Sequence, residues 1–426
     1  MDGPGRHGGG KVKNMKNGKL ACRFCGKTLD HAIVDLGMSP LANSYLKPGQ
    51  LLAMEPFYPL KVYVCDSCFL MQLPAFQRPD EIFSDYAYFS SYSDAWLAHA
   101  RKYTEVMIER FGFNRSSQVV EIASNDGYLL KNFAERGVPV LGIEPAANVA
   151  AEAIRKGIAT IVDFFGAVTA ANLVEKGIQA GLLIGNNVLA HVPDINDFVS
   201  GMKLILKPDG IITMEFPHLM CLMTGNQFDT IYHEHFSYFS FITVEKIFSR
   251  HGLSIFDVDE LPTHGGSLRI YACHSGLAGR SLTENVHGLR QMEMDAGYDD
   301  IEFYKSFASQ VTETKRKALE FLIKAKKENK SIAAYGAPAK GNTLLNYCGI
   351  STDFIDYTVD RSPHKQGRYL PGTHIPIYGP EKIEQTRPDY LVILPWNLKE
   401  EIMGQMAHIR KWGGRFAVLI PEARIL

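Results

Sequence analysis

Short apolar runs alternate with amphipathic, helix-like stretches over most of the chain. Between residues 118 and 217 the runs are "VVEI", "VPVLGI", "IATIVDFF", "AGLLIGNNVLAHV" and "GIITMEFP", and helical patterns separate them. Strands that alternate with helices are typical of a parallel sheet covered by helices on both faces. Such sheets bind ligands at the carboxyl ends of their strands. The pattern predicts an α/β domain, whose bounds we place at residues 81–295.

A second and smaller alternation follows near the end of the sequence. A long charged helical pattern at 298–330 predicts a helical connector over residues 296–330. After it come the apolar runs "SIAAYG", "FIDYTVD", "YLVILP" and "RFAVLIP", again with helical patterns between them. Because about 100 residues is a usual domain size, we expect a second α/β domain over residues 331–426.

Length and composition favour a globular protein of several domains. At 426 residues the chain is too long for one ordinary core. Hydrophobic residues make up 46% and charged residues 21%, and the net charge of −1 argues against nucleic-acid or membrane partners. Residues 1–20 are rich in Gly and Lys and lack the apolar core of a signal peptide. We therefore expect a disordered lead at 1–20 and a cytoplasmic protein.

Four cysteines form two C-x2-C pairs, "CRFC" and "CDSC". They are Cys22, Cys25, Cys65 and Cys68. Two such pairs are the usual sequence sign of a tetrahedral zinc site with four thiolate ligands. Zinc fits better than a redox pair, which needs no second copy; four unrelated thiols are the alternative. Since four cysteines leave no open coordination position, the pattern predicts a structural zinc in an N-terminal domain at 21–80.

Acidic residues stand at the ends of three predicted strands in the 81–295 domain. Glu121 precedes the turn "ASNDG", Glu144 follows the second strand, and Asp163 ends the third. A carboxylate after the second strand can accept both hydroxyls of a ribose, and Asp163 would suit an adenine amino group. The dinucleotide motif G-x-G-x-x-G is absent from the sequence, so the pattern favours S-adenosylmethionine (SAM) over NAD. Plain helix capping is the alternative for these carboxylates.

The stretch "TIYHEHFSYFS" at 230–240 combines two histidines, a glutamate and two tyrosines. His233 and His235 are two positions apart, whereas the helical zinc motif H-E-x-x-H places its histidines four apart. On a strand the two imidazoles would share a face and could bind a metal, but no third ligand is obvious nearby. The other interpretations are a packed aromatic strand and a catalytic segment in which an imidazole removes a proton.

Two glycine-containing stretches offer further candidate sites. "YGAPAKGNTLLNY" superficially resembles a phosphate-binding G-x-x-x-x-G-K-[ST] loop, but Asn342 stands where the lysine belongs, which argues against an ATPase. The loop still follows a strand and opens a helix, so its backbone could cradle a diphosphate beside Lys340. "HGGSLRIY" is either a close-approach turn near a ligand or a tight hairpin. The basic loop "VDRSPHKQGRYLPG" is either part of a ligand surface or simply solvated.

Together these motifs resemble a known family, the SAM-dependent C-methyltransferases of deoxysugar biosynthesis, which methylate a carbon of a nucleotide-linked keto-sugar. The likeness extends from Cys22 to the end and includes "EIASNDGYLL", "IEPAANVA", "NNVLAHVPDINDF", "YHEHFSYFS", "HGGSLRIY" and "YGAPAKGNTLLNY". One difference is Ala123, where the family often has glycine and where a methyl group could crowd the cofactor. The resemblance implies a Rossmann-like SAM methyltransferase core with a small zinc-binding N-terminal domain and a second, smaller C-terminal α/β domain that holds the nucleotide-sugar.

The resemblance also implies roles for individual residues. The catalytic candidates are His235 as general base, His191 and Tyr232 as donors to an enolate oxygen, Glu234 as an orienting carboxylate, and Tyr86. The candidates for the cofactor are Glu121, Ala123, Ser124, Asn125, Gly127, Glu144, Pro145, Asp163 and Asn186. The candidates for the substrate are Tyr88, His233, Lys340, Asn342, Arg361, His364 and Lys365.

The implied reaction is methylation of C3 of a dTDP-4-keto-deoxysugar through an enolate. A ketone acidifies the neighbouring C–H, a histidine can remove that hydrogen near neutrality, and preorganised donors stabilise the developing oxyanion. Three alternatives stay open: an NAD-dependent nucleotide-sugar oxidoreductase or epimerase, a non-catalytic binding module, and a methyltransferase with another acceptor. The sequence leaves open the sugar, the methylated carbon (C3 or C5), the stereochemical outcome and the oligomeric state, and a monomer is compatible with it.

Overall fold

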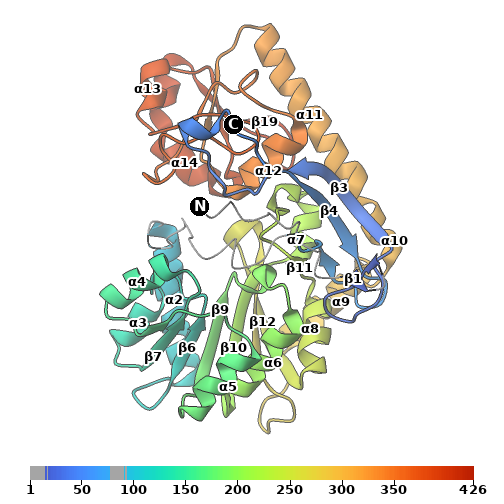
Figure 1. Cartoon of the computed structure of the whole chain (residues 1–426), viewed down its shortest axis with the longest axis vertical. Helices are drawn as coiled ribbons and strands as arrows, with labels where there is room; N and C mark the ends of the chain where they lie inside the picture. Colours follow the sequence, from blue (N-terminus) through green and yellow to red (C-terminus); the bar gives the residue numbers. More distant parts are fainter. Residues whose placement is uncertain (1–14, 17, 77–90, 92–93) are drawn as a thin grey trace, which may run out of the picture.

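The central part of the molecule is a seven-stranded sheet. The computed structural model describes residues 15–16, 18–76, 91 and 94–426, and Figure 1 shows the central sheet below a second α/β layer. The strand order is β12-β13-β10-β9-β6-β7-β8. The strands are β6 (Val119–Ile122), β7 (Val140–Ile143), β8 (Thr160–Ile161), β9 (Ala180–Asn186), β10 (Leu206–Pro217), β12 (Leu253–Leu261) and β13 (Ser267–His274).

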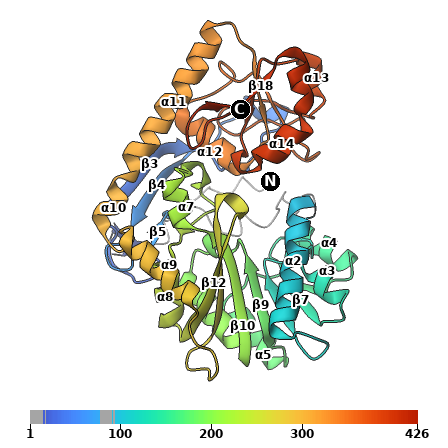
Figure 2. The ribbon, with the colours of Figure 1, turned by 180° about the vertical axis from the view of Figure 1, so that it is seen from behind.

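Strands β6 to β10 pair in parallel, and β13 runs antiparallel to both β10 and β12. These five parallel strands correspond to the five predicted apolar runs and confirm the predicted α/β core. Helices enclose the sheet, with α5 and α6 in front of it in Figure 1 and α2 on the opposite face, which is in front in Figure 2. They are α2 (Asp94–Phe111), α3 (Leu130–Ala134), α4 (Ala147–Arg155), α5 (Ala167–Glu175), α6 (Ile195–Ile205) and α8 (Phe241–Arg250).

The strand order reverses between β6 and β9, because β7 lies on one side of β6 and β9 on the other. The loops that follow these two strands therefore diverge and leave a crevice at their carboxyl ends, where α/β sheets bind ligands. Caps set the helix starts beside this edge: the Asp194 side chain accepts from the Asp197 N–H at the start of α6, and Ser240 accepts from the Thr243 N–H at the start of α8.

The C-terminal part contains a six-stranded sheet with the same kind of reversal. Its order is β16-β15-β14-β17-β18-β19, parallel except for β19 at the edge. Its strands are β14 (Ile332–Tyr335), β15 (Thr358–Val359), β16 (Ile377–Tyr378), β17 (Tyr390–Ile393), β18 (Arg415–Val418) and β19 (Arg424–Ile425). Its helices are α12 (Ala339–Cys348), α13 (Lys382–Thr386) and α14 (Lys399–Gln405). The crevice here lies between the loops after β14 and β17.

The N-terminal strands form a third, antiparallel sheet in the order β11-β5-β4-β3. Strands β3 (His31–Ser39), β4 (Tyr58–Val64) and β5 (Met71–Gln72) come from the start of the chain. Strand β11 (Ser237–Tyr238) comes from the middle and pairs with β5. Within the expected lead, β1 (Met15–Lys16) pairs with β2 (Lys19–Leu20), and residues 1–14 lie outside the described part.

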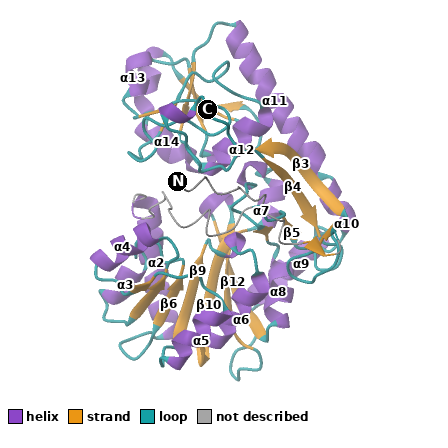
Figure 3. Ribbon diagram, in the orientation of Figure 1, coloured by secondary structure: helices purple, strands orange, loops and turns teal. Residues whose placement is uncertain are grey.

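A helical region links the central and C-terminal sheets. It contains α9 (Glu284–Asp295), α10 (Ile301–Lys305) and α11 (Phe307–Lys327), with a break at Ser306 inside the helix expected at 298–330. Helix α11 runs beside β3 and up along the C-terminal layer (Figure 3). Buried side chains of the N-terminal sheet, α11 and the C-terminal sheet form one continuous hydrophobic cluster. Among the described helices, none combines the length and apolar character needed to cross a membrane.

Candidate active site

The four paired cysteines lie together beside the N-terminal sheet. The Sγ atoms of Cys22 and Cys68 are 3.5 Å apart, those of Cys25 and Cys65 are 3.4 Å apart, and all four lie within 4.8 Å of one another. Zinc–sulfur bonds of about 2.3 Å in a tetrahedron place sulfur atoms roughly 3.8 Å apart, so the group fits a zinc ion. The buried Gln72 amide donates to the Cys22 sulfur at 3.2 Å, which is the outer support typical of such sites.

This cysteine cluster is the only group of three or more His, Cys, Asp or Glu side chains in the described residues that is close enough to hold a metal ion. A zinc ion there would have four thiolates and no open coordination position, so its role is structural.

The turn after β6 is held by the carboxylate of Glu144. One oxygen accepts the Asn125 N–H and the other accepts the Ala146 N–H, both at 2.9 Å. Glu144 is 5% exposed, and burial raises its pKa while the two backbone hydrogen bonds oppose that rise. Each oxygen keeps a second lone pair, so Glu144 can still accept a ribose hydroxyl. Pro145 follows it directly and is half-buried.

The same turn uses left-handed backbone conformations at Ala123 (φ 54°), Asn125 (φ 52°) and Gly127 (φ 76°). This conformation costs roughly 1–2 kcal/mol for an L-residue with a side chain, so Ala123 is strained where the family often has glycine. The turn also packs closely on β7, since a Cβ on Gly142 would lie 2.4 Å from the Ser124 Oγ. The turn is therefore set by close packing and by Glu144 together.

Several buried polar atoms near the ends of β6 and β9 find no hydrogen-bond partner among the described residues. They are the Glu121 Oε2, the Ser124 Oγ and both amide atoms of Asn186. Burial, followed by the charges of Glu144 and Asp126, raises the pKa of Glu121 well above its usual range. Unpaired acceptors and donors at a sheet's switch point suit a polar, cationic ligand, and SAM carries both a sulfonium and an ammonium group. These residues fit SAM.

Asp163 lies at the surface just after β8. One of its oxygens accepts from the Phe164 N–H at 2.8 Å and the other from the Thr169 hydroxyl at 3.0 Å. Both contacts join Asp163 to the loop and first turn of α5, but the N-cap residue of that helix is Gly166, so Asp163 does not cap it. Asp163 therefore lies at the carboxyl end of β8, and each of its oxygens already accepts one hydrogen bond from a nearby residue.

Residues 230–236 form a turn between the 3-10 helix η4 (Phe228–Thr230) and β11 rather than a strand. We call residues 230–236 the catalytic segment, after the role that is proposed for them below. The His235 Nδ1 lies 2.9 Å from the Thr230 carbonyl oxygen and its Nε2 lies 2.8 Å from the Tyr232 hydroxyl. Since a carbonyl only accepts, we infer that Nδ1 carries the hydrogen and that Nε2 accepts from Tyr232.

His191 lies beside this pair, at the end of the 3-10 helix η3 (Leu189–His191) that follows β9. Its Nδ1 donates to the Glu234 carbonyl oxygen at 2.9 Å, and its ring centroid is 4.7 Å from that of His235. Burial lowers the pKa of His191 to about 4, and burial together with His191 lowers the pKa of His235 well below its usual range. Both imidazoles are therefore neutral at pH 7 and have a nitrogen lone pair.

His233 faces different neighbours from His235. Its Nε2 lies 3.2 Å from the Pro59 carbonyl oxygen, and its ring packs edge-on against Tyr58 and Phe76. Burial lowers its pKa to about 4. The structure places His233 at the junction with the N-terminal sheet, so the two histidines do not share a ligand-facing side.

The side chain of Glu234 contacts the N-terminal domain. Its Oε1 accepts from the Asn43 amide at 2.8 Å, and its Oε2 finds no partner in the described part of the chain. Burial raises the pKa of Glu234 to about 7, and the Asn43 hydrogen bond opposes that rise. The backbone carbonyl of Glu234, rather than its carboxylate, orients an imidazole, that of His191.

The loop after β14 leads into α12, whose second residue is Lys340. We call residues 336–340 the Lys340 loop. The Lys340 Nζ lies 3.1 Å from the Asn397 Oδ1 and 5.0 Å above the Trp396 ring. The Trp396 indole donates to the buried Asp229 carboxylate at 2.7 Å. Burial lowers the pKa of Lys340, and the Lys340 charge is one of the influences that lower the pKa of His235.

Burial raises the pKa of Asp229 to about 6, against the opposing influence of Lys340 and Trp396. Asn342, one turn into α12, is 1% exposed, and neither atom of its amide has a hydrogen-bond partner among the described residues. The neighbouring Thr343 hydroxyl donates to the Ile231 carbonyl oxygen at 2.9 Å, so α12 packs directly against the catalytic segment.

The basic loop after β15 contributes Lys365 to the same region. Its Nζ donates to the Ala337 carbonyl oxygen at 2.9 Å and lies 3.6 Å from the Asp360 carboxylate. Arg361 and His364 are exposed beside it. Tyr86 and Tyr88 lie outside the described residues.

The "HGGSLRIY" stretch is a close-approach turn. A Cβ on Gly265 (φ 94°) would lie 2.5 Å from the Trp396 ring, and one on Gly266 (φ 116°) would lie 2.5 Å from the Cys221 sulfur. The turn thereby packs Trp396 against the central domain. Sequence reasoning missed Asn43, Asp229 and Trp396, since no motif marks them; each acts through a contact with another domain.

The fold and the cysteine cluster define a class: a Rossmann-like methyltransferase with zinc-binding and C-terminal domains. Three family models match the chain: "Putative zinc binding domain" at residues 22–83, "Methyltransferase domain" at 96–258 and "C-methyltransferase C-terminal domain" at 262–421. The chain is 36% identical to the C-methyltransferase NovU of Streptomyces niveus over 405 residues, covering 95% of this chain and 96% of NovU. It belongs to the same C-methyltransferase family and is a SAM-dependent C-methyltransferase.

Solved methyltransferases also match part of this chain. The magnesium protoporphyrin IX methyltransferase of Synechocystis, solved with bound SAH, is 16% identical and covers 46% of this chain and 92% of its own, with a TM-score of 0.35. A SAM-dependent methyltransferase from Anabaena variabilis is also 16% identical, with a TM-score of 0.35 over 42% of this chain and 86% of its own.

Proposed function

We propose that this C-methyltransferase methylates C3 of a dTDP-4-keto-deoxysugar, with His235 as the base that generates an enolate. One observation carries the proposal: the neutral His235–Tyr232 pair packs against His191, which follows β9, and the Lys340 charge is close enough to lower the pKa of His235. An acidic loop suits a cationic methyl donor, and a lysine at a helix start suits a diphosphate. The position of the methylated carbon follows from the family resemblance.

The chemistry at the site begins with proton removal. The C–H next to the sugar ketone loses its proton to the Tyr232–His235 pair, and the proton ends on the His235 Nε2, whose lone pair faces the tyrosine hydroxyl. The Nδ1–H bond to the Thr230 carbonyl oxygen stabilises the imidazolium that forms.

The developing enolate oxygen needs hydrogen-bond donors. The Tyr232 hydroxyl is the candidate donor, and such donors are each worth roughly 3 kcal/mol of barrier in well-studied enzymes. The neutral His191 ring gives its single N–H to the Glu234 carbonyl oxygen and so has no hydrogen left for the enolate. SAM supplies an electrophilic methyl group when bound. The residues at the ends of β6, β7 and β9 would hold SAM, which would give its methyl group to the deprotonated carbon and leave as S-adenosylhomocysteine.

The Lys340 loop would hold the diphosphate. Gly336 (φ 90°) turns the chain after β14, and the first N–H groups of α12 follow it. Lys340 adds a positive charge in a half-buried position, where a charge pair is less screened than at the surface. The Lys365 Nζ donates to the carbonyl oxygen of Ala337, the residue after Gly336, and so adds a second positive charge beside this loop.

The test is calorimetric titration of the protein with SAM, dTDP and NAD, followed by turnover of dTDP-4-keto-deoxysugars. Binding of SAM and dTDP without NAD, and a new methyl signal on C3 in the NMR spectrum of the product, would support the proposal. SAM binding without dTDP binding would point to a different acceptor. A methyl group on C5 would move the site of reaction. NAD binding in place of SAM would overturn the proposal.

A further inference from the structure

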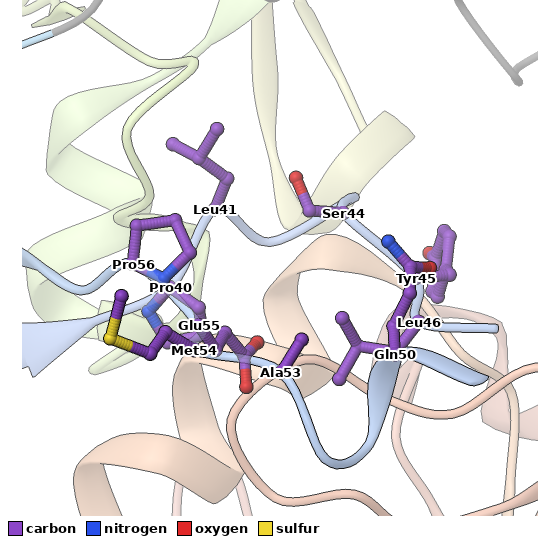
Figure 4. A pocket seen from close by; sticks show the side chains of 10 residues that line it. All are labelled: Pro40, Leu41, Ser44, Tyr45, Leu46, Gln50, Ala53, Met54, Glu55 and Pro56. Carbon is purple, nitrogen blue, oxygen red and sulfur yellow. The ribbon is translucent and has the colours of Figure 1, made fainter. Parts of the chain in front are cut away.

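A segment of the N-terminal domain extends onto the C-terminal domain and passes the catalytic segment on the way. We call residues 40–57, between β3 and β4, the bridging segment. Its Glu55 carboxylate accepts the Gly372 N–H at 2.8 Å and lies 3.0 Å from the His374 Nε2. The segment folds around a cavity of about 250 Å³, lined by Tyr45 and Glu55 among others (Figure 4). It is therefore anchored at its far end, away from the zinc cluster.

Near its start the bridging segment contacts the active site through two side chains. The Asn43 Nδ2 donates to the Glu234 Oε1 at 2.8 Å. The Tyr45 hydroxyl donates to the Ala337 carbonyl oxygen at 2.6 Å and lies 3.2 Å from the Asn43 Oδ1. Since Oδ1 faces the hydroxyl, the Asn43 amide is oriented with its donor group toward Glu234.

Glu234 transmits this contact to the histidines through its backbone. Its side chain is 3% exposed and held by Asn43, and its carbonyl oxygen accepts the His191 Nδ1–H at 2.9 Å. A shift of the Glu234 side chain would therefore move the peptide that sets the orientation of the His191 ring. His235 is the next residue in the chain.

We propose that Asn43 is a positioning residue of the methyl-transfer site, which holds the Glu234 carboxylate and, through the Glu234 peptide, the His191 ring. This inference rests on the proposed function in taking Glu234 and His191 as active-site residues. The N-terminal domain would then contribute to catalysis through this hydrogen bond, in addition to being stabilised by its structural zinc.

The Asn43 hydrogen bond opposes the effect of burial on the pKa of Glu234, so the charge of that carboxyl depends on Asn43. Titratable groups next to Glu234 include Tyr45, whose pKa the Glu234 charge helps to raise, and His191, which donates to the Glu234 backbone carbonyl. His233 and His235 are its neighbours in the chain. The three imidazoles are neutral at pH 7, since burial lowers their pKa values. The Asn43 amide is thus the donor that stabilises the ionised carboxylate, whose pKa lies at about 7.

The experiment compares Asn43→Leu, Asn43→Asp and the exposed control Asn114→Leu with the wild type. Carbon-13 NMR of glutamate-labelled protein, assigned with Glu234→Gln, follows the Glu234 carboxyl without substrate. A hydrogen bond to a charged group is worth roughly 1.5–3 kcal/mol, so we expect the Glu234 titration midpoint to rise by about one to two pH units in Asn43→Leu. Asn43→Asp should raise it further, because two close carboxylates disfavour double ionisation.

Turnover supplies the second readout. Above its pKa Glu234 is ionised, so activity that needs the carboxylate falls as the pH is lowered through that pKa. In Asn43→Leu this acidic limb should move up by the same one to two units, and kcat at pH 7 should fall roughly tenfold or more with a smaller change in KM. In a Glu234→Gln background, Asn43→Leu should change kcat by less than about twofold.

The outcomes separate this inference from the proposed function. An unchanged Glu234 midpoint in both Asn43 variants, or an equal loss of kcat with and without Glu234, would overturn the inference. If the protein turned over no keto-sugar at all while the midpoint still moved, the proposed substrate would be wrong and the Asn43–Glu234 contact would stand. Asn114→Leu should behave as wild type in both readouts.

Discussion

The central and C-terminal sheets reverse their strand order in the same way, yet the loops at their switch points carry opposite charge. After β6 the turn carries Asp126 and lies beside Glu121 and Glu144, whereas after β14 the loop carries Lys340. Shared topology therefore offers two candidate ligand sites, and under the proposal above the side chains decide what each one would hold. The carboxylates after β6 and β7 suit a sulfonium and an ammonium, and Lys340 suits a diphosphate.

The largest expected effect comes from removing the proposed base, His235. Asn at position 235 can still donate to the Thr230 carbonyl oxygen but has no basic nitrogen, so His235→Asn should lower kcat by about 10²–10⁴-fold. Binding of SAM and of dTDP should stay within about twofold, as measured by calorimetry. The exposed histidine variant His287→Ala is the control. Turnover within tenfold of wild type would place the base elsewhere.

A reciprocal pair of substitutions tests whether the two loops hold different ligands. Glu144→Gln replaces one accepting oxygen by a donor and should weaken SAM binding roughly 10–100-fold, with dTDP unaffected. Lys340→Met keeps the apolar stem without the charge and should weaken dTDP binding about tenfold, with SAM unaffected. Calorimetry with both ligands measures the four affinities. If either variant weakened the binding of SAM and of dTDP equally, the proposal that the two loops bind different ligands would be contradicted.

Proton exchange on binding should have opposite signs at the two sites. Burial and neighbouring carboxylates raise the pKa of Glu121, so a bound cation would drive off its proton. The affinity for SAM should therefore fall by up to tenfold per pH unit as the pH is lowered through that pKa. Burial lowers the pKa of Lys340, so a bound diphosphate should take up a proton in alkaline buffer, and its affinity should fall as the pH rises.

Calorimetry in buffers of different ionisation enthalpy reads these protons directly. Glu121→Gln should abolish the proton release with SAM, and Lys340→Met should abolish the uptake with dTDP. Heats that do not depend on the buffer would show that neither group changes its charge on binding.

The smallest expected effect concerns the backbone of the two loops. Ala123 (φ 54°) and Gly336 (φ 90°) both follow the first strand of their sheet in the left-handed region. Ala123→Gly should stabilise the fold by about 0.5–1 kcal/mol by removing that strain. Gly336→Ala should destabilise it by at least as much, since the new Cβ would lie 2.6 Å from the Pro395 Cδ. Denaturant unfolding measures both, and a destabilised Ala123→Gly would contradict the strain argument.

The sequence allowed the repeating parts of the molecule to be predicted. Apolar periodicity marked β6 to β10, β14, β15, β17 and β18, because buried parallel strands are short and almost wholly apolar. The spacing of Cys22, Cys25, Cys65 and Cys68 predicted a cluster that the structure brings together. The residues around the catalytic segment stay predictions, with the contacts described above as their support.

What the sequence did not indicate depends on contacts between distant parts. Asn43 lies in an unremarkable stretch, "LANSYLKPG", and matters only because the bridging segment passes Glu234. Asp229 and Trp396 belong to different domains and meet through one hydrogen bond. The turn conformation of residues 230–236 also overrides an aromatic pattern that suits a strand. No local periodicity reports such long-range packing.

The pairing of β11 with β5 has a consequence for how the molecule assembles. The strand that leads out of the catalytic segment is hydrogen-bonded into the sheet that also carries the cysteine cluster. Strands β3 to β5 are synthesised long before β11, so the edge of this sheet at β5 stays unpaired until β11 is made. The pairing of β5 with β11 joins residues far apart in the chain and therefore has a high contact order. The N-terminal part is thus not a tethered accessory that could be exchanged between enzymes at will. The conformation of residues 230–236 and that of the zinc-binding sheet therefore depend on each other through the β5–β11 pairing. Removal of the zinc should disorder residues 230–236 as well as the cysteine cluster.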